Sequence, residues 1–177
     1  MLSLFQFQEE AAATVSSHIS EYLEAPARTT VNKKPHVAPF FQALSALTGS
    51  GKTVVLAEAV SQISDTMPVK PVIIWLSRGR VVVRQTFVNL SPGGKYHHLL
   101  DGMAVDVLAN YKPEIVAEAD RGLVYFATVG TFNQKDKATG NLLIYKSDVD
   151  TMEASIWEAI RLRIDSQGRR RPLIVFR

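Results

Sequence analysis

The chain has 177 residues, 46% of them hydrophobic and 21% charged, a composition typical of one globular domain of about 100–200 residues. This hydrophobic content excludes disorder of the whole chain, and the absence of cysteine excludes a disulfide framework or a cysteine-ligated zinc site. No apolar run approaches the roughly 20 residues of a membrane span, so we expect no membrane association.

The net charge of +3 is concentrated in one segment. Residues 161–177 contain six arginines and a single acid, Asp165. This pattern is typical of a solvated loop and helix face, with a nucleic-acid contact as the alternative. A cysteine-free chain without a secretory signal suits a reducing compartment, so we expect a cytoplasmic protein.

The first third of the chain begins with helical periodicity. Apolar residues recur at helical spacing over residues 8–24, and Pro26 ends this predicted helix. The polar segment 26–36 contains two prolines and is predicted to be a loop. A short buried strand over residues 40–47 and a helix over residues 52–63 are predicted next.

The remaining two thirds alternate between strand and helix patterns. The predicted strands cover residues 71–76, 105–108, 123–128, 141–145 and 173–176. The predicted helices cover residues 80–90, a short segment from Pro113, and residues 152–164. Residues 91–102 contain a Pro-Gly-Gly turn and are predicted to be a loop. Alternating strands and helices predict an α/β fold with a mostly parallel sheet flanked by helices.

A glycine-rich loop joins the predicted strand 40–47 to the helix that follows it. It reads Ala46-Leu47-Thr48-Gly49-Ser50-Gly51-Lys52-Thr53 and departs from the P-loop pattern G-x-x-x-x-G-K-[ST] only at Ala46. Glycines allow positive φ and a close approach to phosphate, and successive N–H groups at a helix start bind anions. Lys52 would then neutralise phosphate charge, and the Thr53 hydroxyl would ligate Mg²⁺. The loop predicts nucleotide binding.

The hexapeptide T-G-S-G-K-T resembles motif I of superfamily 2 helicases and translocases, and in particular the helicase domain of type III restriction enzyme Res subunits and related DEAD/DEAH-box proteins. The resemblance implies a RecA-like P-loop NTPase fold, with ATP and Mg²⁺ as cofactors. It also implies ATP-dependent helicase or translocase activity on DNA, within a restriction-modification system that includes a modification subunit.

A second resemblance lies near the N-terminus. Phe7-Gln8-Glu9-Glu10-Ala11-Ala12 is similar to the family signature Y-Q-x-x-A, in which the glutamine reads the adenine edge of ATP. Gln8 lies 44 residues before Lys52, a separation that is typical of the family. A carboxamide suits this role because it both donates and accepts hydrogen bonds. A helix N-cap or a surface glutamine is the alternative interpretation of Gln8.

Two further segments are similar to nucleic-acid-binding motifs of the family. Residues 72–77 and the turn after them are similar to motif Ia, and residues 124–132 are similar to a later motif in which a threonine hydroxyl meets a phosphate. The chain departs from motif Ia, because Ser77-Arg78-Gly79-Arg80 stands where the family often has proline and threonine. The resulting candidate nucleic-acid contacts are Arg78, Arg80, Gln85, Thr128 and Thr131.

The C-terminal strand, residues 173–176, corresponds in the family to the strand that leads into the Asp-Glu of the D-E-x-H box, and the chain ends before that box. We therefore expect residues 1–177 to be the N-terminal part of an incomplete first motor domain, with the helix and loop of residues 1–36 ahead of a P-loop core over residues 37–177. Lys52 and Thr53 are its only expected catalytic residues, and we expect no ATPase activity from it alone.

Two alternatives to a motor protein remain. One is a complete small nucleotide kinase, whose arginine-rich lid would be residues 161–171. The other is a non-enzymatic nucleic-acid-binding module that uses the basic C-terminus.

Overall fold

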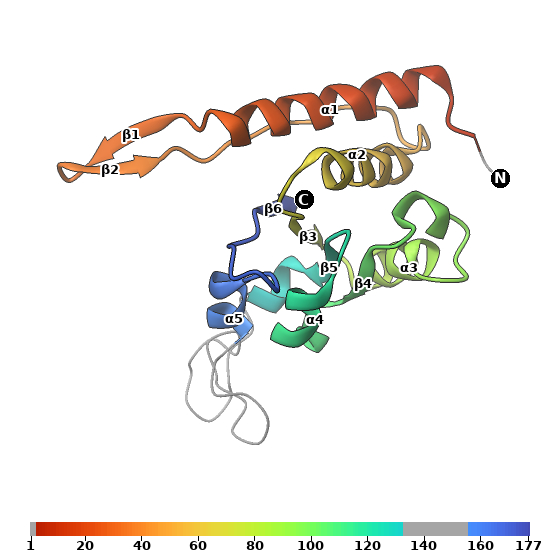
Figure 1. Ribbon diagram of the computed structural model, residues 1–177. Helices are drawn as coiled ribbons and strands as arrows, with labels where there is room; N and C mark the ends of the chain where they lie inside the picture. The colour runs from red at the N-terminus through yellow and green to blue at the C-terminus, as the bar shows by residue number, and fades with distance from the viewer. Residues whose placement is uncertain (1–2, 133–155) are drawn as a thin grey trace. The chain divides into compact units, whose positions relative to one another are not determined.

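The computed structural model describes residues 3–132 and 156–177. The chain divides into two compact units, Met1–Met67 and Pro68–Arg177. The first unit contains two helices and a hairpin, and the second contains a four-stranded sheet with its helices (Figure 1). Within the described ranges, no helix combines the length and the apolar content that are needed to cross a bilayer.

The first unit is built on a long helix that packs against a second one. Its elements are α1 (Gln6–Glu24), β1 (Arg28–Val31), β2 (Lys34–Val37) and α2 (Lys52–Thr66). Ala12, Val15 and Ile19 form the buried stripe of α1, which confirms the predicted periodicity. Helix α2 begins at the predicted residue and runs one turn beyond the predicted end.

The prediction of a loop over residues 26–36 is wrong. Strands β1 and β2 form an antiparallel hairpin in which Val31 pairs with Lys34 and Arg28 pairs with Val37. The two turn residues, Asn32 and Lys33, both have positive φ, at 52° and 62°. This geometry is that of the tight turns that match the twist of a hairpin, and the sequence lacks the glycine that usually marks them.

The prediction of a buried strand over residues 40–47 is also wrong. Among the described residues this segment pairs with no strand, and Phe41 and Leu47 are 86% and 84% exposed. Its beginning runs along α1 instead: the Tyr22 hydroxyl donates to the Ala38 carbonyl, and the Tyr22 ring stacks on Phe40 at 5.2 Å. A strand needs a hydrogen-bonded neighbour, and an apolar run alone does not provide one.

The second unit contains a parallel sheet of four strands. They are β3 (Val72–Ser77), β4 (Ala104–Val107), β5 (Leu123–Thr128) and β6 (Leu173–Phe176), in the order β4-β5-β3-β6. All three neighbouring pairs are parallel, and the register places Ser77 opposite Thr128 and Phe176 opposite Trp75. The predicted α/β fold with a parallel sheet is confirmed, and β5 and β6 have the predicted bounds.

The connections between these strands form the helices of the second unit. They are α3 (Arg80–Leu90), α4 (Pro113–Glu118), α5 (Ile156–Leu162), and three 3₁₀ turns, η1 (His97–Leu100), η2 (Leu108–Asn110) and η3 (Val129–Phe132). The predicted helix over residues 80–90 and the helix start at Pro113 are confirmed. The predicted strand over residues 141–145 and the predicted helical residues 152–155 lie outside the described residues.

Alternate residues of the strands build a core on each face of the sheet. On one face, Ile74 of β3 and Tyr125 of β5 belong to a cluster that includes Val116 of α4 and Ile160 of α5. The Tyr111 ring lies 4.9 Å from that of Tyr125 in the same cluster. Burial raises the pKa of Tyr125 to about 12, so its hydroxyl stays neutral at any ordinary pH.

On the opposite face, the core is aromatic. Trp75 stacks on Phe126 at 5.6 Å and contacts Phe176 at 5.9 Å, and Phe87 of α3 meets Phe126 edge-on. These rings join β3, β5, β6 and α3.

The basic segment after α5 is largely occupied within the fold. The predicted helix continued to residue 164, but it ends at Leu162, because Arg163 has a φ of 27° and its Nε atom donates to the Arg171 carbonyl at 2.7 Å. Asp165 accepts bonds from the backbone N–H groups of Gln167 and Arg169 and from Arg169 Nε. Partial burial acts to raise the pKa of Asp165, but these hydrogen bonds outweigh it and hold that pKa below its usual range.

Arg171 is 4% exposed, and its guanidinium donates to three backbone carbonyls, those of Lys70, Ala117 and Ala119. Burial lowers the pKa of Arg171, although the group remains charged. This side chain therefore ties the segment before β3 to the end of α4.

We predict that Arg171→Met lowers the free energy of unfolding by about 2–4 kcal/mol, because charged hydrogen bonds to three backbone carbonyls are lost from a buried position. Arg170→Met is the matched control, since the neighbouring Arg170 is exposed, and it should cost less than about 0.5 kcal/mol. Urea unfolding measures both values. Equal costs for the two variants would contradict a structural role for Arg171.

Candidate functional site

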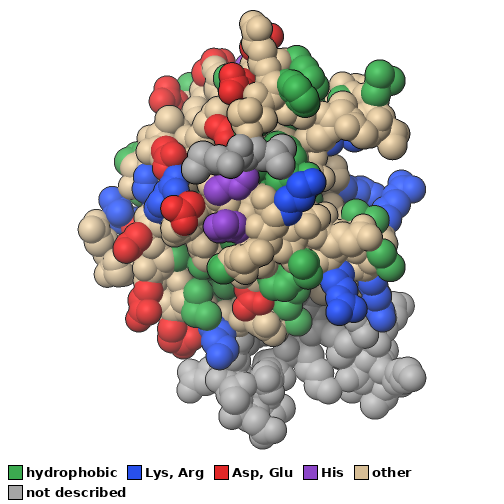
Figure 2. Space-filling model, turned by 90° about the vertical axis from the view of Figure 1, so that its right-hand side faces the viewer, with side chains coloured by type: hydrophobic (Ala, Val, Ile, Leu, Met, Phe, Trp, Pro, Cys, Tyr) green, Lys and Arg blue, Asp and Glu red, His purple; other side chains and the backbone are tan. Residues whose placement is uncertain are grey.

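Side chains of both charges are mixed on the face shown in Figure 2, so charge alone does not mark a binding surface there. Two local arrangements bring predicted site residues together. One is the glycine-rich loop in the first unit, and the other is a hollow at the carboxyl ends of the strands in the second unit.

The glycine-rich loop, residues 46–53, is folded by two glycines in the left-handed region. Gly49 has φ of 85° and Gly51 has φ of 83°, and Gly51 is the N-cap of α2. The first N–H groups of a helix have no carbonyl acceptor within the helix. The loop therefore presents backbone donors at the positive end of the α2 dipole, where anions are favoured.

The Lys52 side chain folds back over this loop. Its Nζ donates to the Ala46 carbonyl at 2.7 Å and to the Leu47 carbonyl at 2.9 Å. The Ser50 hydroxyl also donates to the Leu47 carbonyl, at 2.8 Å. These bonds hold the loop closed around the ammonium group, so that the one cation of the loop lies among its backbone groups.

Gln8 of α1 reaches the same loop across 42 residues of sequence. Its Nε2 donates to the Ser50 carbonyl at 2.9 Å, and its Oε1 accepts from the Phe5 N–H at 3.0 Å. The side chain is 8% exposed. The Gln8 carboxamide thus accepts a bond from Phe5, the N-cap of α1, and donates one to the glycine-rich loop. Gln8 is the third residue of the helix and is buried, so it is neither the N-cap nor a surface glutamine.

The structure places the predicted nucleotide-binding residues on one loop and one helix start. Gly49, Ser50, Gly51 and Lys52 form the loop, with Gln8 against Ser50. Thr48 is exposed within the loop, and Thr53 is half-buried in the first turn of α2. The loop and α2 start fit a phosphate group, because they combine backbone donors, one lysine and a hydroxyl at position 53.

A hollow of about 750 Å³ lies at the carboxyl ends of β3, β4 and β5. It is lined by Arg78, Arg80, Val83, Val107, Leu108, Ala109, Phe126, Ala127, Thr128, Gly130 and Thr131. The parallel register explains this convergence, since Ser77 lies opposite Thr128 and Val107 lies opposite Phe126. Ligands of open parallel sheets bind at this end of the strands.

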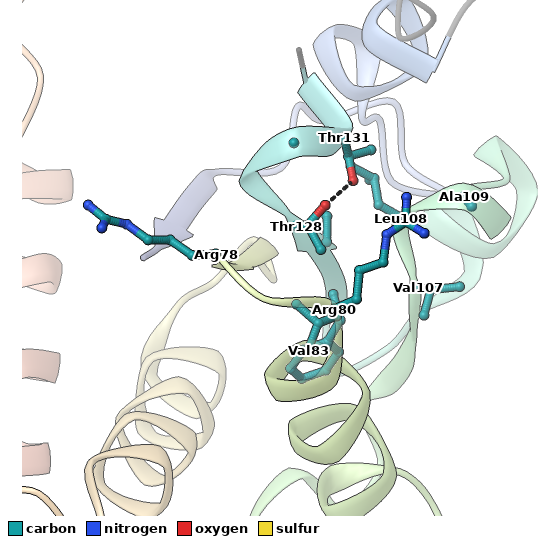
Figure 3. Close-up of a pocket in the computed structure, with 11 residues that line it drawn as sticks. Arg78, Arg80, Val83, Val107, Leu108, Ala109, Thr128 and Thr131 are labelled. Carbon is teal, nitrogen blue, oxygen red and sulfur yellow. Dashed lines mark hydrogen bonds between the residues drawn. The ribbon is translucent and has the colours of Figure 1, made fainter. Parts of the chain in front are cut away.

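The polar groups of the hollow are two arginines and two threonines. The Thr128 and Thr131 hydroxyls are hydrogen-bonded to each other at 3.1 Å, as Figure 3 shows. In the same view, the Arg80 side chain extends to the side of Thr131 and Leu108, and that of Arg78 extends away from them. Among the residues that the structure describes, no carboxylate lines the hollow.

Arg78 and Arg80 stand at the start of α3, where the helix dipole is positive and where stability favours acids. The first turn of α3 contains no acid. The two arginines and the helix end therefore all contribute positive charge near the start of α3, where an anion is favoured.

Gln85 does not belong to this hollow, although it was predicted with the other four residues. It is exposed on α3, two positions after the buried Val83, and two positions turn a helix by about 200°. Val107–Ala109 and Gly130 also line the hollow, although they were not predicted as site residues. Val107 and Leu108 end a predicted strand, Ala109 follows it, and Gly130 lies in the turn after another predicted strand.

Comparison with known proteins gave no match to a family model, to a curated protein or to a solved structure. Function is therefore argued from the residues and their arrangement.

The contact between Gln8 and the loop predicts different costs for two glycine substitutions. Gly49→Ala and Gly51→Ala both place alanine at positive φ, which costs roughly 1–2 kcal/mol. A Cβ at Gly51 would also lie 2.4 Å from Gln8 Nε2, whereas one at Gly49 meets nothing within 4 Å. We expect Gly51→Ala to be the more destabilising by about 1 kcal/mol, measured by urea unfolding.

The double variant Gln8→Ala/Gly51→Ala tests the cause. Removing the side chain relieves the clash, so the extra cost of Gly51→Ala over Gly49→Ala should vanish in the Gln8→Ala background. Additive costs would show that Gln8 does not contact this loop.

Proposed function

We propose that this chain belongs to the first, RecA-like motor domain of an ATP-dependent DNA helicase or translocase of superfamily 2, of the kind found in type III restriction enzymes. The observation that carries the proposal is the hydrogen bond from Gln8 to Ser50. One family resemblance singled out both residues, which lie 42 positions apart in the sequence. In the structure they are in direct contact.

ATP and Mg²⁺ are the proposed cofactors of the glycine-rich loop. Bound there, Mg²⁺ would supply charge neutralisation on the phosphates, with the Thr53 hydroxyl as its protein ligand. Lys52 would exchange its two loop carbonyls for phosphate oxygens, and backbone donors of residues 51–53, at the start of α2, would hold the remaining charge. Gln8 keeps one amide hydrogen and one lone pair beyond its two observed bonds, and these are the groups proposed to read adenine.

The hollow of the second unit is proposed as the DNA contact. Its arginines and threonine hydroxyls are the groups that most often bind phosphates, and such contacts fix the position of a nucleic acid without reading its sequence. The four predicted residues Arg78, Arg80, Thr128 and Thr131 all line it. A translocating protein needs this kind of contact, because it must hold any sequence equally well.

The alternative of a nucleotide kinase would use residues 161–171 as an arginine-rich lid. Arg163 and Arg171 donate to backbone carbonyls, and Arg169 pairs with Asp165 at 2.8 Å. Three of the basic side chains that a lid or a basic tail would use are thus engaged within the fold, which weighs against both that kinase and a module that binds through its C-terminus.

The nucleotide proposal predicts two different effects on affinity. Lys52→Ala removes a charge-assisted contact and should weaken ATP and GTP alike, by about 10- to 150-fold. Gln8→Ala should weaken ATP more than GTP, because only the base edge differs. Calorimetry with each nucleotide and Mg²⁺ measures both, with the exposed Lys95→Ala as the control.

Unchanged ATP affinity in Lys52→Ala would contradict the phosphate site. If Gln8→Ala lowers the affinities for ATP and GTP equally, Gln8 does not read the base and only positions the glycine-rich loop.

The DNA proposal predicts a loss of DNA affinity that does not depend on the DNA sequence. Arg78→Gln/Arg80→Gln should weaken duplex DNA equally for unrelated sequences, and the slope of log K against log salt should fall by about 1.8, for two lost phosphate contacts. Gln85→Ala is the matched control on the exposed side of α3 and should retain binding. A loss confined to one sequence, or an equal loss in the control, would contradict the hollow as a backbone contact.

A further inference from the structure

The hairpin β1–β2, residues 28–37, is exposed along its whole length. Every residue of both strands is exposed, so neither face of the hairpin is covered within its unit. It projects beyond the C-terminal end of α1 in Figure 1. A two-stranded hairpin that packs against nothing is marginal as a source of stability, so this one adds little to the core.

The charge of the hairpin is of one sign. It carries Arg28, Lys33 and Lys34, and the sequence has no acid between Glu24 and Glu58. Lys33 and Lys34 lie at the tip, where the turn is held by positive φ at Asn32 and Lys33. The three cations therefore have no carboxylate on their own element.

Register places hydroxyls beside these cations. Thr29 pairs with His36 and Thr30 pairs with Pro35, between Arg28 at one end and the lysines at the other. Arg28 lies opposite Val37, three residues from Lys34, so the two cationic ends are about 10 Å apart. A row of cations and hydroxyls over this distance is suited to successive phosphates of a polynucleotide.

We propose that the hairpin β1–β2 binds the phosphate backbone of a nucleic acid, at a second contact that uses no residue of the hollow or of the glycine-rich loop. An anionic membrane would attract the same charges, but the hairpin has only Val31 and Val37 as large apolar side chains and no aromatic residue to enter a bilayer. The inference rests on the proposed function only in taking nucleic acid as the polyanion.

The test uses the whole chain and two charge-matched double variants. Lys33→Gln/Lys34→Gln removes the tip charges, and Lys95→Gln/Arg170→Gln removes two exposed charges elsewhere. Anisotropy of fluorescein-labelled oligothymidine should show binding weakened roughly tenfold or more at low salt for the hairpin variant only, with the salt slope reduced by about 1.4. Arg28→Gln, which lies away from the turn, should reduce the slope by about half as much.

If Lys33→Gln/Lys34→Gln binds oligothymidine as tightly as the unmodified chain, the inference about the hairpin is overturned. If Arg78→Gln/Arg80→Gln loses binding in the same experiment, the proposed function of the hollow still stands. An equal loss in the hairpin variant and its control would also overturn the inference, because it would show a general effect of net charge. The inference would also be overturned if Lys33→Gln/Lys34→Gln lost binding to phosphatidylserine vesicles but kept its binding to oligothymidine. That result would make the hairpin a membrane contact.

Discussion

In-register parallel pairing of β3 with β5 is the constraint on which the second unit depends. Parallel strands all end at one edge, so the residues after Ser77 and Thr128 emerge together. The same pairing stacks Trp75 on Phe126 on one face and places Ile74 and Tyr125 in the cluster of the other. The packing that stabilises the sheet and the hollow at its carboxyl edge therefore have a single origin.

In the first unit, the glycine-rich loop lies against the start of the long helix α1, although the chain leaves that helix at its other end. Helix α1 has 19 residues and is about 28 Å long, and the hairpin follows its far end. The chain returns because Tyr22 holds Ala38 and Phe40, and Gln42 lies 3.0 Å from His18. Extended backbone of this length easily spans the helix, so that Ser50 arrives at Gln8.

The cations of this protein fall into two classes that composition does not distinguish. Arg163 and Arg171 are enclosed by backbone carbonyls, which buried guanidinium groups require. Arg78 and Arg80 stand at a helix start without an acid in its first turn, and the hairpin cations have no acid on their element. Cations without a carboxylate on their own element are the better candidates for binding phosphate. In the arginine-rich C-terminus, by contrast, three of the six arginines are engaged within the fold.

Much of the second unit could be predicted from the sequence, because strands buried on both faces and amphipathic helices leave strong local patterns, as residues 80–90 and 123–128 illustrate. Gln8 was singled out only by a family resemblance, and its contact with Ser50 of the glycine-rich loop comes from the structure. Local pattern failed at residues 26–36 and 40–47, and at Gln85. Whether an apolar run becomes a strand depends on a partner for its backbone, and whether a helical side chain reaches a site depends on which face the core takes. Both are properties of the packed chain, and only the tertiary structure decided them.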